Sequence, residues 1–251
     1  YDLIPQILPG SADEFRLLTD AVGEKGYRQI DINLGCPFPM IAGKHKGAGM
    51  LLYPAQVAEV LAPIAEYPEI QFSLKMRLGW ENASECMVLV ELLNTLRLSR
   101  IALHARTGKQ QYKGHPDLEA FQGFYELCQH PLYYNGGIES LSDIRQILTR
   151  FPLLKGVFIG RGLLSSPLLA KEFKGNETFL PEQRMSIYFA FHEELFSAYS
   201  QVLQGETQLL VKMKTLWEYF LPETDRKLLK RIKKSTRLQQ YTESVKAIFT
   251  S

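Results

Sequence analysis

The chain has 251 residues, of which 45% are hydrophobic and 22% charged, and its formal net charge is +2. This is the composition of a folded protein with one large domain and room for a smaller one. No apolar run approaches the ~20 residues that span a bilayer, and no signal-like segment is present, so we expect a cytoplasmic protein with no membrane partner. Cys36, Cys86 and Cys128 are odd in number and lack CxxC spacing, which argues against a disulfide framework and a metal site.

Strand-like runs alternate with helical patterns along most of the chain. The strand-like runs begin near Leu3, Gln29, Ile70, Arg100, Leu132 and Gly156. Ser11 and Glu14 form a capping box before the first predicted helix, Pro54 opens another, and Pro63 is expected to end that helix early. Further helical patterns cover residues 83–96 and follow Pro116 and Ser140. Strict alternation predicts an α/β fold with a parallel sheet.

Six strands are two short of a (β/α)₈ barrel, and the chain begins at Tyr1 already within a strand-like run. We therefore expect residues 1–173 to form a TIM (β/α)₈-type barrel that lacks its first two βα units. The alternation stops after Lys171, and helical patterning begins at Pro181. Residues 181–251 are expected to form a small all-α C-terminal domain.

The strand at residues 71–77 has one apolar and one polar face, because side chains two apart share a face. Its apolar residues are Phe72, Leu74 and Met76, and its polar residues are Ser73, Lys75 and Arg77. In a parallel barrel the polar residues at the strand ends converge on the C-terminal mouth. The residues expected to meet there are Gln6, Asn33, Lys75, Arg77, His104, Arg106 and Asn135.

A cysteine follows the second strand, in the segment DINLGCP at residues 31–37. Cys36 lies between Gly35 and Pro37, where the chain can neither extend a strand nor begin a helix at once, so the thiol is expected to face a cavity. A thiol with a reference pKa of about 8.5 stays largely protonated at neutral pH and can act as a general acid. Cys86 and Cys128 lie in helical patterns and are expected to be ordinary packing residues.

Two glycine-bearing segments follow the fifth and sixth strands, and they read Asn135-Gly136-Gly137 and Gly160-Arg161-Gly162. Glycines allow backbone N–H groups to approach an anion, and barrel enzymes commonly hold a phosphate between their last two strand ends. Arg161 would add a fixed positive charge. No GxGxxG motif opens a βα unit, which argues against a Rossmann-type dinucleotide site.

The C-terminal region is basic. Ten Lys or Arg residues stand against four acidic residues between Lys212 and Lys246. Such a stretch is often only a solvated helix face, but here the basic residues surround a narrow apolar stripe, and a docked helix with a basic outer surface suits a phosphate backbone. The residues expected to contact a nucleic-acid backbone are Lys230, Arg231, Lys233 and Lys234.

From about Ile4 to Pro167 the chain resembles the tRNA-dihydrouridine synthases. The matching segments, in order, are DINLGCP at 31–37, GAGMLL at 47–52, LKMRLGW at 74–80, LHART at 103–107, NGG at 135–137 and IGRG at 159–162. The resemblance implies an enzyme that uses FMN to reduce the C5=C6 bond of uridine in tRNA to 5,6-dihydrouridine, with NADPH as reductant. It implies no protein partner.

The resemblance also implies residue roles. Cys36 would be the proton donor, and Asn33 and Arg77 would contact the uracil. The implied flavin contacts are Gln6, Lys75, His104, Asn135, Gly136, Gly137, Gly160 and Arg161. Lys75 is expected to stabilise the anionic reduced flavin, and Arg106 is expected to orient a loop.

The chain departs from the family pattern in two places. Residues 38–40 read Phe-Pro-Met where many members carry a basic residue, and Gly137 replaces an acidic one. Lys44, His45 and Lys46 are expected to supply the missing positive charge from further along the loop.

Three other functions stay open on the residues alone. A flavin barrel acting on a small pyrimidine or enoate would keep FMN without needing the basic helices. A cysteine hydrolase using Cys36 with His104 would require a thiolate of depressed pKa. A flavin-free RNA-binding protein is disfavoured by the polar residues expected at the barrel mouth.

Overall fold

A computed structural model describes residues 3–250, which form two compact units. Within the described residues, the first unit comprises 3–137 and Ile144–Phe158, and the second comprises Ile138–Asp143 and 159–250. The segment from Ile159 onward therefore groups with the C-terminal helices, whereas the sequence led us to extend the barrel to residue 173. Tyr1, where we expected a strand to be running, lies outside the described residues.

The first unit is built on a six-stranded parallel sheet in the order β1-β2-β3-β4-β5-β6. The strands are β1 (Gln6–Ile7), β2 (Gln29–Leu34), β3 (Gln71–Gly79), β4 (Leu98–Thr107), β5 (Leu132–Asn135) and β6 (Gly156–Phe158). Each strand pairs in parallel with the next one along the chain. This sequential order is the one found within a (β/α)₈ barrel, and it confirms the predicted α/β class.

Helical segments connect successive strands. They are α1 (Ala12–Gly23), α2 (Pro39–Ala42), the 3₁₀ helix η1 (Gly47–Leu52), α3 (Pro54–Leu61), the 3₁₀ helix η2 (Ala62–Glu66), α4 (Glu85–Thr95), α5 (Leu118–Leu127) and α6 (Leu141–Arg150). The Ser11 hydroxyl accepts the N–H of Glu14 at 3.2 Å, so the predicted N-cap is confirmed. Pro63 falls where α3 ends and η2 takes over, because proline removes a backbone donor and crowds the preceding turn.

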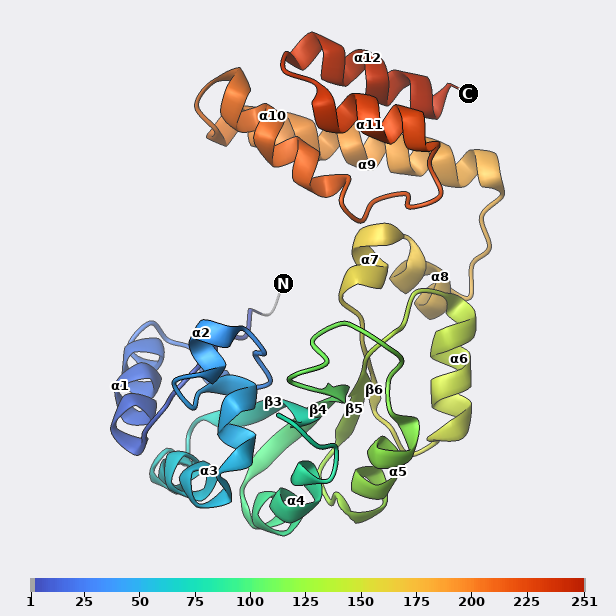
Figure 1. Ribbon diagram of the computed structural model, residues 1–251. Coiled ribbons are helices and arrows are strands. Elements are labelled where there is room, and N and C mark those ends of the chain that lie inside the picture. The colour runs from blue at the N-terminus through green and yellow to red at the C-terminus, as the bar shows by residue number, and fades with distance from the viewer. Residues whose placement is uncertain (1–2, 251) are drawn as a thin grey trace. The chain divides into compact units, whose positions relative to one another are not determined.

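The curved sheet has an outer face packed under α1, α3, α4 and α5 (Figure 1). The side chains of Ile32, Leu74 and Leu103 on this face are fully buried. The opposite face carries the polar residues, and Ser73 and Arg77 are only 3% and 2% exposed. Buried polar groups cost free energy unless they are paired, so this face needs an organised network of partners.

The second unit is helical, as expected for the C-terminal region. Its helices are α7 (Arg161–Ser165), α8 (Leu169–Gly175), α9 (Pro181–Val202), α10 (Gly205–Leu216), α11 (Arg226–Lys234) and α12 (Leu238–Phe249). In Figure 1, α9 to α12 pack side by side. Their shared core includes Met213, Trp217, Ile232 and Tyr241. Over residues 3–250, no helix combines the length and apolarity needed to cross a membrane.

A chain of polar contacts runs through this helical core. The Tyr241 hydroxyl lies 2.6 Å from Nε2 of His192 and accepts the indole N–H of Trp217 at 3.0 Å. Because that hydroxyl has one proton, it donates to Nε2, and Nδ1–H of His192 donates to Glu193 at 3.0 Å. Burial lowers the pKa of His192, which keeps the ring neutral.

Tyr241→Phe should destabilise the helical unit by about 1–3 kcal/mol, because it leaves the indole N–H and the imidazole Nε2 buried without a partner. Urea unfolding followed by circular dichroism would measure the change. Tyr219→Phe is the matched control, since Tyr219 is 39% exposed. Equal stability of the two variants would contradict this account of the core.

Candidate functional site

The strand register brings the predicted polar residues together at the carboxyl edge of the sheet. Asn33 of β2 is the register partner of Lys75 of β3, Arg77 of β3 is the partner of His104 of β4, and His104 is in turn the partner of Asn135 of β5. All five side chains lie on the same face, because partners in a parallel pair point the same way. The predicted convergence of these residues is therefore observed.

Asn33 holds the turn that carries Cys36. Its side-chain oxygen Oδ1 accepts the backbone N–H groups of Gly35 and Cys36 at 2.9 and 2.8 Å. Its Nδ2 donates to Oε1 of Gln6 at 2.7 Å, and Nε2 of Gln6 donates to Asp31 at 2.5 Å. The structure thus gives Asn33 and Gln6 a positioning role, and their contacts with uracil and flavin stay predictions.

A second support for Cys36 comes from the start of η1. Gly47 has a φ of +56°, and a Cβ atom there would lie 2.8 Å from the carbonyl oxygen of Cys36. The neighbouring Ala48 N–H donates to the same carbonyl at 3.0 Å. Glycine is therefore required at position 47 both for its backbone conformation and for the close approach. The Cys36 side chain itself is partly exposed.

The other two cysteines are packing residues, as predicted. Cys86 is buried, and burial raises the pKa of its thiol to about 12. Burial also raises the pKa of Cys128, which is partly buried. Neither thiol is an effective nucleophile or acid at neutral pH.

Arg77 donates hydrogen bonds to three backbone carbonyls. Its Nε donates to Gly35 at 3.0 Å, and its Nη1 donates to Thr107 at 2.9 Å and to Gln111 at 2.7 Å. Loss of hydration lowers the pKa of Arg77 to about 10, while Tyr112, which lies beneath the guanidinium, counteracts this. Arg77 therefore fixes the loops that follow β2 and β4 around the site, and its predicted contact with uracil stays a prediction.

Lys75 is a cation without a partner. It is partly buried, and within residues 3–250 no hydrogen bond or ion pair involves its ammonium group. Burial, with a smaller contribution from the charge of Arg77 and against the opposing effect of Asp31, lowers the pKa of Lys75 to about 8. An unpaired ammonium at this depth is costly unless an anionic or strongly accepting ligand completes it.

His104 and Arg106 form a buried pair, with Nη1 of Arg106 lying 3.2 Å from Nε2 of His104. A guanidinium can only donate, so Nε2 is the acceptor and the ring proton is on Nδ1. Nη2 of Arg106 donates to the Gly114 carbonyl at 3.0 Å, in keeping with its expected role in orienting a loop. Asn135 donates from Nδ2 to the Phe158 carbonyl at 2.8 Å and so fastens β5 to β6.

The glycine segments have the expected backbone freedom. Gly136 and Gly137 have φ values of +135° and +63°, which other residues rarely adopt. A Cβ atom at Gly160 would meet nothing within 4 Å, so its backbone is open to approach. Gly160 and Arg161 belong to the second unit, and their role in phosphate binding stays a prediction.

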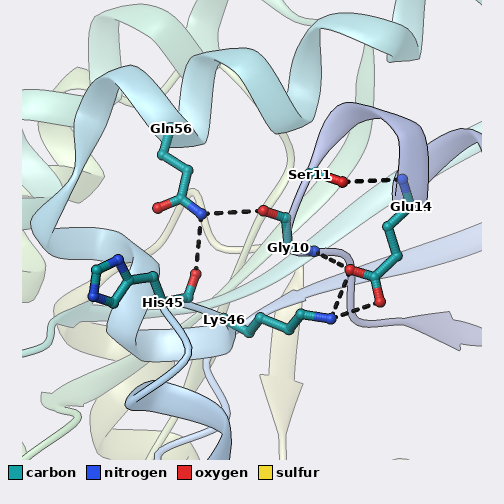
Figure 2. A network of polar contacts seen from close by, with 6 residues as sticks. All are labelled: Gly10, Ser11, Glu14, His45, Lys46 and Gln56. Atoms are coloured by element: carbon teal, nitrogen blue, oxygen red, sulfur yellow. Dashed lines mark hydrogen bonds and ion pairs between the residues drawn. The ribbon is translucent and has the colours of Figure 1, made fainter.

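The charge expected from the loop at residues 44–46 is only partly available. Lys46 is held by the carboxylate of Glu14, with Nζ 2.6 Å from both oxygens (Figure 2). Its charge is therefore neutralised within the protein, and it does not supply the missing positive charge as expected. Lys44 and His45 are exposed. The sequence indicated only the N-capping role of Glu14, because the two partners lie 32 residues apart.

The predicted RNA contacts lie on α11. This helix flanks a groove of about 420 Å³ lined by Lys227, Lys230, Arg231, Lys234, Ser235, Gln240, Glu243 and Ser244. Three of the four predicted residues thus share one surface, and Lys233 is not among the lining residues. The apolar stripe of the helix is confirmed, since Ile232 is buried and both Leu228 and Leu229 pack against the core.

Comparison with known proteins finds one family model and several relatives that match the chain. The family model described as "Dihydrouridine synthase (Dus)" matches residues 3–250. The chain is 28% identical over 174 residues to tRNA-dihydrouridine synthase B of Vibrio vulnificus, covering 66% of this chain and 54% of that protein. It is 32% identical over 139 residues to a probable tRNA-dihydrouridine synthase of Rhizobium leguminosarum, covering 55% and 44%.

The chain spans about half the length of these curated relatives. Among solved structures, morphinone reductase aligns with 69% of this chain and 51% of its own, at 14% identity and a TM-score of 0.49.

Lys75→Met should stabilise the ligand-free protein at pH 7 by on the order of 1–2 kcal/mol. The folded pKa of Lys75, about 8, lies below its ordinary value of 10.5. The folded state therefore releases this proton first, and wild-type stability should gain as pH rises from 8 towards 10.5. Urea unfolding at several pH values would measure this, and an unchanged pH profile in Lys75→Met would contradict it.

Proposed function

The chain belongs to the dihydrouridine synthase family, and on this basis we propose that it reduces the C5=C6 bond of uridine in tRNA to 5,6-dihydrouridine, using FMN and NADPH. The observation that carries the proposal is a partly exposed thiol, Cys36, held at the carboxyl edge of the sheet where the unpaired ammonium of Lys75 also lies. The names of the relatives support tRNA as the substrate. A tRNA substrate in turn supports a cytoplasmic location.

The residues at the strand ends fit FMN. Bound and reduced FMN supplies the hydride that this chemistry needs. Lys75 would place its positive charge against the electron-rich reduced ring, which gives the ammonium the partner it lacks. The other groups of the first unit that would hold the cofactor are Gln6, His104, Asn135, Gly136 and Gly137.

Cys36 would supply the proton. Its Sγ–H protonates the carbon next to the one that receives the hydride. Asn33 and Gly47 hold the backbone on both sides of Cys36, and this support would keep Sγ in the geometry that proton transfer needs. Arg77 interacts electrostatically with Cys36, so the guanidinium would stabilise the thiolate that remains after proton transfer. Water then restores the proton, because the side chain is partly exposed.

The second candidate is an FMN oxidoreductase that acts on a small pyrimidine or enoate. It would use the same sheet edge but would leave the basic groove beside α11 without a function. Family membership argues against the cysteine hydrolase and the flavin-free RNA-binding protein. In addition, Nε2 of His104 accepts a hydrogen bond from a cation, which makes this ring a poor base for Cys36.

Cys36→Ala should leave flavin content and NADPH oxidation nearly unchanged, while dihydrouridine formation falls by about 10²-fold or more, the usual contribution of a positioned acid. Mass spectrometry of the digested tRNA would measure the product. Cys128→Ala is the control and should keep full activity. Complete tRNA reduction by Cys36→Ala would contradict the proton-donor role, and loss of flavin would indicate a structural one.

Removing Lys230, Arg231, Lys233 and Lys234 together should flatten the dependence of tRNA affinity on salt by about three units of log–log slope, because each phosphate contact releases a counterion. FMN content should be unaltered. Lys230→Gln and Lys233→Gln form a matched pair, since only Lys230 lines the groove. The first should weaken binding more, and an unchanged slope in the quadruple variant would favour the small-substrate alternative.

A further inference from the structure

A network of polar contacts links the loop after β1 to the loop before η1 (Figure 2). Nζ of Lys46 lies 2.6 Å from both carboxylate oxygens of Glu14, and Oε2 of Glu14 also accepts the Gly10 N–H at 2.8 Å. The two side chains are only 25% and 35% exposed. The hydrogen bond from Lys46 is the main reason that the pKa of Glu14 is lowered. A partly shielded, charge-assisted pair of this kind holds its geometry better than a surface ion pair does.

Two further contacts hold the same loops together. Nε2 of Gln56 donates to the Gly10 carbonyl at 3.1 Å and to the His45 carbonyl at 3.3 Å, as Figure 2 shows. The Lys46 side chain crosses directly over Gly10, where a Cβ atom would lie 2.5 Å from Cε of Lys46. The segment that ends at Lys46 is thus fastened to the loop before α1 by both side-chain and packing contacts.

This fastened segment leads directly to Cys36. Lys46 is followed by Gly47, whose α-carbon lies close against the backbone of Cys36. Next comes Ala48, whose backbone N–H donates to the Cys36 carbonyl at 3.0 Å. Asn33 holds the N–H side of Cys36, as described above. The carbonyl side depends on where residues 47 and 48 lie, and the contact between Lys46 and Glu14 fixes the residue immediately before them.

We propose that Lys46 and Glu14 are positioning residues for Cys36. Their ion pair anchors the start of η1, and η1 in turn holds the carbonyl side of the turn that presents the thiol. This inference rests on the proposed role of Cys36 as the proton donor. Without the ion pair, the start of η1 is held less firmly and the carbonyl side of Cys36 loses support, so the thiol spends less time in the productive geometry.

The loop's own chemistry supports positioning over direct binding of RNA. Both oxygens of Glu14 neutralise the Lys46 ammonium, so a phosphate would have to compete with a carboxylate already in contact. Lys44, two residues earlier, is exposed, and within residues 3–250 it has no ion pair. Lys44 is therefore the better candidate for a phosphate contact and serves as the matched control.

The test measures the alkylation rate of Cys36 by iodoacetamide, peptide by peptide, in Lys46→Met, Lys46→Arg, Glu14→Gln and Lys44→Met. Lys46→Met should raise the rate about threefold or more, because the turn opens more often. Glu14→Gln keeps an acceptor for the Gly10 N–H and should act in the same direction. Lys46→Arg should restore the wild-type rate, and Lys44→Met should not change it. Buried Cys86 reports any general unfolding.

Activity gives a second readout. In Lys46→Met, product formation from the pre-reduced enzyme should fall about tenfold, while flavin reduction by NADPH and tRNA affinity stay within about twofold of wild type. An unchanged alkylation rate in both Lys46→Met and Glu14→Gln would overturn the proposal. Loss of tRNA affinity with unchanged Cys36 reactivity would overturn it too and would make Lys46 a phosphate contact.

These outcomes are separable from the role of Cys36 itself. If Cys36→Ala proved fully active, the proposed proton donor would be wrong, yet the alkylation rates would still show whether the ion pair positions the turn. If Lys46→Met exposed Cys86 to the reagent, the variant would be partly unfolded, and Glu14→Gln would decide the question.

Discussion

The parallel register of β2 to β5 is the constraint on which the site depends. It sets Asn33 beside Lys75 and sets His104 between Arg77 and Asn135. A slip of one residue in any strand would turn its polar set outward and bring its apolar set into the mouth. The fully buried outer face opposes such a slip, because every apolar side chain there would lose its packing under the helices. The packing that stabilises the sheet thus also fixes which polar side chains meet at its carboxyl edge.

On the polar face, some side chains hold the surrounding loops and others are left available for ligand. Arg77 uses its donors on carbonyls of the loops around the site, and Asn33 uses both ends of its amide to shape the turn at Cys36. On this face the ammonium of Lys75 makes no hydrogen bond or ion pair within residues 3–250, and Cys36 is partly exposed. In a site of this kind, the side chains that set the geometry are held by hydrogen bonds, and the side chains that bind ligand keep free hydrogen-bonding capacity. The ion pair between Lys46 and Glu14 extends the rigid part by one further layer of contacts.

Local signals in the sequence predicted much of this arrangement. The two-residue alternation around Lys75 predicted which side chains share a face, and the capping box at Ser11 predicted where a helix begins, because both depend on neighbouring residues only. The contact between Lys46 and Glu14 depends on how two loops meet in space, so no local pattern indicates it. The positioning role of Asn33 was missed for a related reason, since the turn after β2 decides which backbone donors its side chain can reach. The resemblance to a family supplied residue roles, but it could not distinguish residues that contact flavin or uracil from residues that position other residues.

The central claim is that the carboxyl edge of the sheet holds FMN through Lys75 and its neighbours. The most direct measurement is the visible absorption spectrum of the protein after incubation with FMN and removal of free flavin, followed by addition of NADPH. The account predicts a yellow protein with the flavin bound in stoichiometric amount, bleached by NADPH and recoloured when tRNA is added without oxygen. A colourless protein from which all FMN is removed would contradict it.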